Sequence, residues 1–286
     1  LFLFLIDSGV SGPAWATVFA QLVSVVICYG RLRGIKEFRL GRCDFAFDYK
    51  LGIELLRNGL PMALMNSVTS VGCIFVQSCI NGYGVIYTSA YSVCNKYLNF
   101  FMLPGITTGF AVSAFSGQNF GAKEFKRIRG GTKTAGLMAL VSALLLGMIL
   151  FLFAGPLAGL MLAGQEAVGY ASVYLKFLAL FLVLLNLLFV FRNCMQGMGK
   201  PAIPMCSGLA EMAIRISVIL YGLPVFGFTA TVYAEGMAWF GALSLNFFAY
   251  LFYLRRMEKT AADSTDDGGA DGNSEQFTAV RPHTDT

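Results

Sequence analysis

The sequence predicts an all-α protein, a polytopic bundle of transmembrane helices, and two observations carry that prediction. Apolar residues make up 56% of the 286 residues and charged residues only 13%, a balance typical of membrane proteins. The apolar residues also gather in runs that are too long for the core helices of a soluble protein, and short polar loops separate these runs.

Each apolar run is long enough to cross a hydrocarbon core about 30 Å thick. The runs cover residues 14–29, 55–80, 85–115, 134–154, 171–192, 203–221 and 229–254. A further short apolar stretch, residues 1–6, has no basic flank, so we interpret it as the end of a helix rather than as a signal peptide. The third run contains Pro104-Gly105 and predicts a kink there, because proline removes a helical hydrogen bond.

Basic residues alternate from one loop to the next and predict an orientation. They gather at residues 31–57, 123–133, 200 and 255–259. Lysine and arginine are absent from residues 7–12, 81–84, 155–169 and 222–228. Since loops rich in lysine and arginine stay on the cytoplasmic side, we expect a multi-pass protein of the cell membrane (inner or plasma membrane) with a cytoplasmic C-terminus. The polar tail from Ala261 onward is expected to be disordered.

The composition also excludes several classes of function. The seven cysteines show no CxxC pairing, and the single histidine, His283, lies in the tail, so no metal site or catalytic triad is predicted. No clustered acid, base and nucleophile is visible, which argues against an enzyme. No basic stripe on a folded face suggests a nucleic-acid partner. The partners expected from sequence are therefore the lipid bilayer and a small organic molecule.

Charged residues inside the predicted spans are the strongest pointers to function, because a polar group at bilayer depth is costly unless it is paired. Glu211 and Arg215 lie four residues apart and share a helix face. They form either a self-neutralising structural pair or a gate or ion-linked switch. Lys96 has no acid within a helical turn, so we expect its side chain to face the interior of the bundle.

Uncharged polar side chains mark the second and third predicted spans as a possible lining of a pathway. Asn66, Thr69 and Gln77 lie in the second span, and Asn95 and Asn99 flank the lysine of the third. Hydrogen bonding between helices explains serine and threonine at such positions equally well, whereas the amides are less easily explained that way.

Short motifs spread over the chain resemble the MATE family of multidrug and toxic compound extrusion transporters. They are Gly59-Leu60-Pro61-Met62-Ala63, Gln77, Asn81-Gly82, Ala90-Tyr91, Lys96, Pro104, Gly117-Gln118-Asn119-x-Gly121-Ala122, Arg127, Arg192-Asn193, Gln196-Gly197-Met198-Gly199, Glu211 and Arg215. The entry to the first full span, with Trp15-Ala16-Thr17, is also similar to that family.

The resemblance implies a domain organisation. Members of this family have two six-helix lobes that work by alternating access. Residues 1–33 would then end an N-terminal lobe, 34–53 would form a cytoplasmic inter-lobe loop, 54–257 would form the C-terminal lobe, and 258–286 the disordered tail. The remainder of the N-terminal lobe would be a missing partner of this chain, and the full-length protein is expected to be a monomer.

The resemblance also assigns two hinge candidates. One is the Pro104-Gly105 step. The other is the polar, basic turn that would join the second and third helices of the lobe, with Gly117, Gln118, Asn119 and Gly121. Its expected role is positional, anchoring and pivoting the lobe.

The coupling ion is not assigned. Several sodium-coupled members carry an acid about two turns after the Gly-Leu-Pro motif, where this chain has Thr69. No cofactor is expected, and the coupling ion is either Na⁺ or H⁺. The resemblance implies an antiporter that exports cationic or amphipathic organic compounds. The alternatives are a flippase for lipid-linked saccharides, which would need a lipid-open cationic groove, and a seven-helix receptor, which the topology disfavours.

Overall fold

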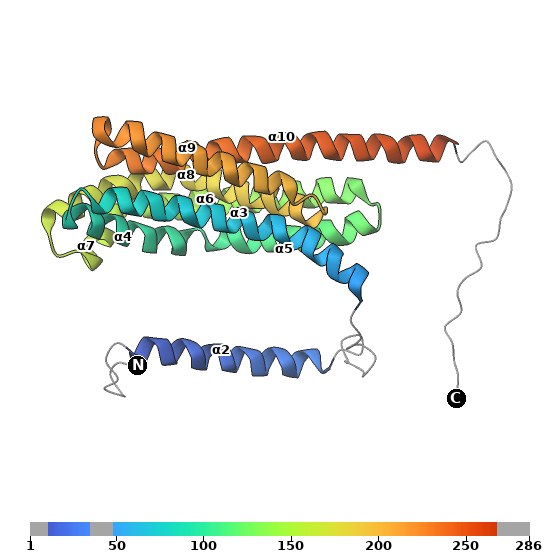
Figure 1. The fold of residues 1–286 in the computed structure, drawn as a ribbon, viewed down its shortest axis with the longest axis horizontal. Coiled ribbons are helices and arrows are strands. Elements are labelled where there is room, and N and C mark those ends of the chain that lie inside the picture. The colour runs from blue at the N-terminus through green and yellow to red at the C-terminus, as the bar shows by residue number, and fades with distance from the viewer. Residues whose placement is uncertain (1–10, 35–47, 268–286) are drawn as a thin grey trace. The chain divides into compact units, whose positions relative to one another are not determined.

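The structure, a computed structural model, describes residues 11–34 and 48–267, and every regular element among them is an α-helix (Figure 1). The helices are α2 (Ser11–Leu32), α3 (Tyr49–Asn81), α4 (Val85–Phe101), α5 (Leu103–Gly121), α6 (Phe125–Leu152), α7 (Ala154–Met161), α8 (Gln165–Gly197), α9 (Ala202–Phe226) and α10 (Thr229–Asp267). Six helices within these ranges are long and apolar enough to cross a membrane, or up to seven spans if the bent pair of α4 and α5 counts as one. The all-α transmembrane prediction is confirmed.

The chain divides into two compact units, residues 1–54 and residues 55–286. In the first unit, α2 is exposed along nearly its whole length and carries large apolar side chains such as Trp15 and Phe19. The start of α3 is fixed locally, because the Asp48 carboxylate accepts hydrogen bonds from the backbone N–H groups of Lys50 and Leu51. The predicted terminal helix end at residues 1–6 and most of the predicted inter-lobe loop lie outside the described residues.

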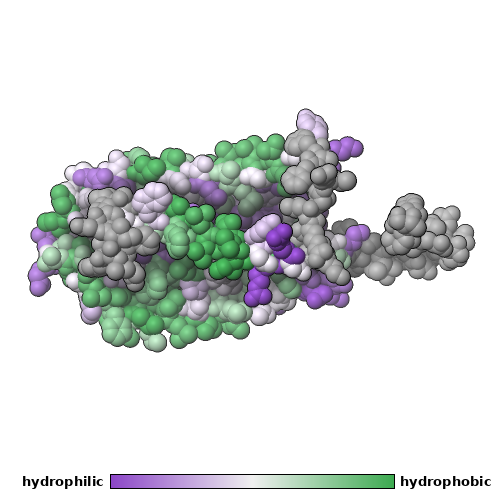
Figure 2. Space-filling view, turned by 90° about the horizontal axis from the view of Figure 1, so that it is seen from below, coloured by the Kyte–Doolittle hydropathy of each residue, from purple (hydrophilic) through white to green (hydrophobic). Residues whose placement is uncertain are grey.

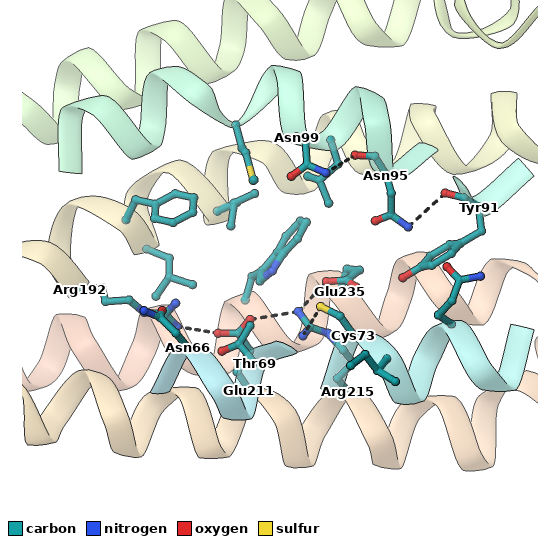
Figure 3. A pocket seen from close by; sticks show the side chains of 18 of the residues that line it. Asn66, Thr69, Cys73, Tyr91, Asn95, Asn99, Arg192, Glu211, Arg215 and Glu235 are labelled. Carbon is teal, nitrogen blue, oxygen red and sulfur yellow. Dashed lines mark hydrogen bonds and ion pairs between the residues drawn. The ribbon is translucent and has the colours of Figure 1, made fainter. Parts of the chain in front are cut away.

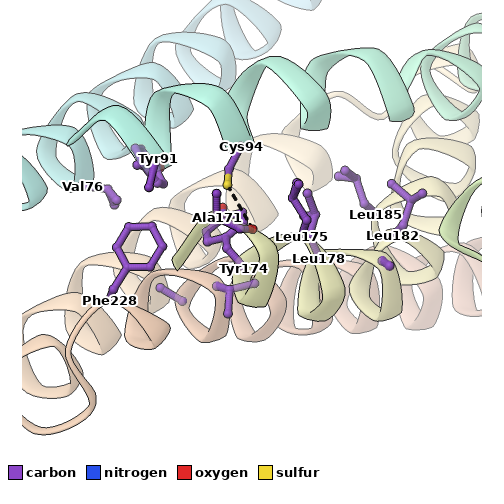
Figure 4. Packing of buried hydrophobic residues seen from close by; sticks show 14 of the residues in the cluster. Val76, Tyr91, Cys94, Ala171, Tyr174, Leu175, Leu178, Leu182, Leu185 and Phe228 are labelled. Atoms are coloured by element: carbon purple, nitrogen blue, oxygen red, sulfur yellow. Dashed lines mark hydrogen bonds between the residues drawn. The ribbon is translucent and has the colours of Figure 1, made fainter. Parts of the chain in front are cut away.

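Helix α8 is the central element of the second unit and contacts α4, α5, α6, α7, α9 and α10. Its buried face carries Tyr174, Leu175, Leu178 and Leu182, which form the middle of the main apolar cluster (Figure 4). The side chain of Phe228 packs on Tyr174 with ring centroids 5.9 Å apart. Apart from polar residues such as Asn186 and Arg192, this helix is largely apolar, as expected of a membrane helix that other helices surround.

The outer surface of this bundle is apolar as well. Figure 2 shows broad hydrophobic areas over the described part of the chain, α2 included. Large apolar side chains such as Leu144, Met148, Phe240 and Phe248 are exposed on α6 and α10. An exposed apolar surface of this extent is a liability in water and is expected against lipid.

The predicted kink is present. Helices α4 and α5 meet at Met102 with a bend of 42°. Pro104 stands in the first turn of α5, where its missing N–H costs no helical hydrogen bond. Since proline is tolerated there but not in a helix interior, the span breaks just before it and a new helix starts.

Helix α5 packs against α8 along glycine residues, which we call the glycine seam. A Cβ atom added at Gly105 would lie 2.0 Å from Oδ1 of Asn186, and one at Gly109 would lie 2.6 Å from Nδ2 of Asn193. A Cβ atom at Gly197 would lie 2.2 Å from the backbone oxygen of Ser113. Small residues let membrane helices approach this closely, so the seam sets the spacing of α5 and α8.

Two elements differ from the sequence prediction. Residues 154–161 form the short helix α7, although most of this stretch was expected to be an outer loop. The last helix continues to Asp267, past Ala261, where the disordered tail was expected to begin. Met257, Glu258 and Lys259 favour helix and extend the last span beyond its apolar part. Residues 268–286 lie outside the described part of the chain.

Candidate functional site

A cavity of about 680 Å³ lies among α3, α4, α8, α9 and α10 of the second unit (Figure 3). Its size suits a drug-sized ligand. Polar and aromatic side chains line one part of it and aliphatic side chains the rest. The lining residues are Asn66, Thr69, Cys73, Ile74, Gln77, Ser78, Asn81, Tyr91, Asn95, Leu98, Asn99, Met102, Leu185, Leu188, Phe189, Arg192, Glu211, Arg215, Glu235 and Trp239.

One wall of the cavity is a row of four charged side chains, Arg192, Glu211, Arg215 and Glu235, which we call the ion row (Figure 3). Nη2 of Arg192 lies 2.6 Å from Oε2 of Glu211. Nη2 of Arg215 lies 3.0 Å from Oε1 of Glu211 and 2.7 Å from Oε2 of Glu235. Positive and negative charges therefore alternate along the row, and together they sum to zero.

The ion row is deeply buried and joins three helices. Its side chains are between 3% and 9% exposed, and they come from α8, α9 and α10. Isolated charges at this depth would be very costly, whereas alternating partners neutralise one another. Arg215 also donates from Nη1 to the Cys73 sulfur on α3, 3.7 Å away. The row thereby contacts a further helix that lines the cavity.

Side-chain amides from α3 and α4 also line the cavity. Nδ2 of Asn95 donates to the Tyr91 carbonyl at 3.2 Å, and Nδ2 of Asn99 donates to the Asn95 carbonyl at 2.8 Å. Nε2 of Gln77 donates to Oδ1 of Asn81 at 2.8 Å. These bonds hold the amides at fixed places along the cavity, where they offer neutral hydrogen-bonding groups to a ligand.

Seven of the eight pathway residues predicted from sequence line this one cavity, although they come from three helices. They are Asn66, Thr69, Gln77, Asn95, Asn99, Glu211 and Arg215. The predicted contact between Glu211 and Arg215 is present, but as part of a longer row rather than as an isolated pair.

Lys96 lies elsewhere. Its side chain is exposed, and it is not among the residues that line the cavity. The 100° step per residue of a helix places it on a different face of α4 from its neighbours Asn95 and Asn99. Its place in the interior of the bundle stays a prediction.

The hinge candidates occupy both ends of α5. Pro104 and Gly105 stand at the bend, and Gly105 also belongs to the glycine seam. At the other end, Gly117 approaches the Gly197 backbone and the buried Asn119 donates from Nδ2 to the Phe115 carbonyl at 2.8 Å.

The turn after α5 is compact. The carbonyl of Gln118 accepts from the Ala122 N–H, and that of Asn119 accepts from the Glu124 N–H. Gly121 meets no neighbour that would crowd a side chain. Lys123 has φ of 59°, a left-handed conformation that closes the turn.

Three side chains that line the cavity were not predicted from the sequence. Glu235 is a carboxylate six residues inside α10, and the rule that an intramembrane charge is a candidate would have found it. Arg192 was placed at the end of its span as a boundary residue, yet α8 continues to Gly197 and leaves the guanidinium within the bundle. Trp239 gave no signal, because an aromatic side chain in an apolar run usually packs in the core. Within residues 11–34 and 48–267, no three histidine, cysteine or acidic side chains group as a metal site.

Known proteins resemble this chain along most of its length. The family model MatE matches residues 61–221, which is more than half of the chain. The probable multidrug resistance protein YoeA of Bacillus subtilis is 30% identical over 162 residues, which make up 55% of this chain and 35% of that protein. The probable multidrug resistance protein NorM of Thermotoga maritima is 22% identical over 240 residues, 83% of this chain and 50% of that protein. The chain thus spans half or less of the length of the curated relatives that it matches.

Solved structures show the same fold. A crystal structure of a mutant of the Vibrio cholerae MATE transporter VcmN matches with a TM-score of 0.80 and 20% identity, over 89% of this chain and 58% of that one. A crystal structure of MATE in the bent conformation matches with a TM-score of 0.79 and 18% identity, over 91% of this chain and 59% of that one.

Proposed function

Because this chain belongs to the MATE family, whose model matches more than half of it, we propose that it forms part of a secondary active transporter that exports cationic or amphipathic organic compounds. The chain is a multi-pass membrane protein, and a bilayer and a small-molecule substrate follow from the family. The antiport mechanism, the cytoplasmic C-terminus and a monomeric full-length protein are our proposals. The relatives named as multidrug resistance proteins support the export of organic compounds.

The single observation that carries the proposal is the cavity with the ion row as one wall. It is large enough for an organic molecule, it combines apolar surface with fixed polar groups, and it lies among helices that could cross a membrane. Its lining contains two arginines and two glutamates, so it is not the cationic groove that a saccharide flippase would need. We therefore favour export of organic compounds over lipid flipping.

Alternating access requires that the substrate and the coupling ion stabilise opposite-facing states to different extents. Glu211 and Glu235 are the acidic side chains that line the cavity, and they are the groups at which this part of the protein could sense a coupling cation. The coupling ion is Na⁺ or H⁺. The bend at Met102 supplies a place at which one half of a span could move while the glycine seam holds the other.

Transport by the full-length protein in lipid vesicles tests this function. Vesicles loaded with a fluorescent amphipathic cation are given either a Na⁺ gradient or a pH gradient, and dye movement is followed. We expect movement that depends on one of the two gradients and stops when an ionophore dissipates it. Lys176 is exposed and lies away from the cavity, so the Lys176→Gln variant should transport the dye as the unmodified protein does. Dye movement that is independent of both gradients would contradict coupled export.

A further inference from the structure

We propose that the ion row recognises the polar end of a zwitterionic amphiphile, with the anionic group of the substrate at Arg192 and its cationic group at Glu235. This inference rests on the proposed function and narrows its substrate class. It comes from the order of charges along the row and from what surrounds each end of it.

The two inner members of the row are already compensated. Glu211 accepts from both arginines through its two oxygens, and Arg215 lies between two carboxylates. Each end member has one ionic partner among the described residues: Glu211 for Arg192, and Arg215 for Glu235. The row therefore presents a positive end and a negative end to the cavity, and the charges between them are satisfied.

The positive end has hydrogen-bonding capacity to spare. A guanidinium carries five N–H donors, and Arg192 makes one ionic hydrogen bond, through Nη2, to Glu211. Its side chain lines the cavity and is 9% exposed, more than any other member of the row. A carboxylate or phosphate matches the planar fork of a guanidinium, and both are the anions that arginine binds best. Arg192 is thus suited to an anionic group that enters the cavity.

The negative end is surrounded by features that favour a cation. Trp239 lies four residues after Glu235 on α10, so both side chains share one face of that helix, and both line the cavity. An organic ammonium beside a carboxylate and an indole face gains from both charge attraction and a cation–π contact. In Figure 3, Glu211 and Arg215 lie between Arg192 and Glu235, the two ends of the ion row.

Charge balance decides between substrate classes. The ion row is neutral, so a purely cationic substrate would add a net charge to a buried wall, whereas a zwitterion adds none. A zwitterion can also satisfy both ends at once. The remaining lining, with Leu188 and Phe189 among its members, suits the apolar body of an amphiphile.

A pair of dyes that differ in one group tests the proposal. A rhodamine ethyl ester is a cation, and the corresponding free acid is a zwitterion with the same ring system. Binding to the purified full-length protein is followed by quenching of Trp239, after Trp15 and any other tryptophan outside the cavity have been replaced by phenylalanine. We expect the free acid to bind on the order of tenfold more tightly than the ester, a difference of about 1.4 kcal/mol.

Variants at the two ends of the row separate recognition from folding. Arg192→Gln leaves the inner Glu211–Arg215 pair intact, and it should abolish the preference for the free acid without weakening the ester. Arg192→Lys keeps the charge and should keep most of the preference. Glu235→Gln should weaken both dyes alike, because both carry the cationic ring system. Unchanged elution on gel filtration checks that each variant is folded.

The outcomes also distinguish this proposal from the proposed function. Equal or tighter binding of the ester, or quenching by neither dye, would overturn the zwitterion assignment. Gradient-driven transport of the ester alone would support export and overturn the assignment. Tight binding of the free acid without gradient-driven transport of either dye would support the recognition site and contradict coupled export.

Discussion

The ion row and the glycine seam both attach neighbouring helices to α8, but they do so in opposite ways. The seam brings α5 to α8 by removing side chains, so that backbone meets side chain or backbone directly. The row joins α8, α9 and α10 through long charged side chains that border a cavity. A contact without side chains has no alternative arrangement, whereas charged partners that border a cavity can exchange. The seam therefore suits a fixed frame, and the row suits a site that responds to a ligand.

The largest expected effect comes from the centre of the row. Arg215→Ala removes the partner of two buried carboxylates, and breaking a buried pair in this way costs about 3–5 kcal/mol. We expect a clearly lower thermal unfolding temperature in detergent. Arg129→Ala is the matched control. A stability equal to the unmodified protein would show that the row does not hold these helices together.

The seam should be the next most sensitive region. Gly197→Val places new atoms against the Ser113 backbone, and overpacking of this kind costs about 1–3 kcal/mol. Gly136→Val on α6 is the matched control, because a Cβ atom there meets nothing within 4 Å. We expect a lower unfolding temperature for the first variant alone. Equal effects of the two variants would contradict close packing of α5 on α8.

The smallest effect should come from an ion pair outside the cavity. Nη2 of Arg129 lies 2.6 Å from Oε2 of Glu258, but the arginine side chain is 42% exposed. Exposed pairs are screened and contribute about 0–1 kcal/mol. Arg129→Ala should therefore shift the unfolding temperature by much less than Arg215→Ala. A shift of similar size would mean that burial does not set the value of ion pairs in this protein.

Hydropathy and loop charge were sufficient to predict the fold class and the positions of the spans, because both depend on composition over many residues. Pro104 predicted the bend for a local reason that tertiary packing did not override. The glycine seam could not be predicted, since a glycine in a membrane helix does not say which helix it meets.

The cavity was predicted in part. The pairing of Glu211 with Arg215 follows from their spacing, but their partners Arg192 and Glu235 come from other helices, and their contacts depend on how these helices pack. Lys96 shows the converse limit. An intramembrane lysine is conspicuous in a sequence, yet the rotation of α4 decides which way it faces, and the structure leaves it exposed.

We propose that the substrate binds in the cavity beside the ion row, and labelling of Cys73 tests this most directly. Its side chain is exposed, lines the cavity and accepts a hydrogen bond from Arg215. In the full-length protein with Cys73 as the sole cysteine, a transported dye should slow labelling by a maleimide. In a matched protein with Cys206 alone, which is exposed but does not line the cavity, the dye should have no effect. Labelling of Cys73 at the same rate with and without saturating dye would contradict the account.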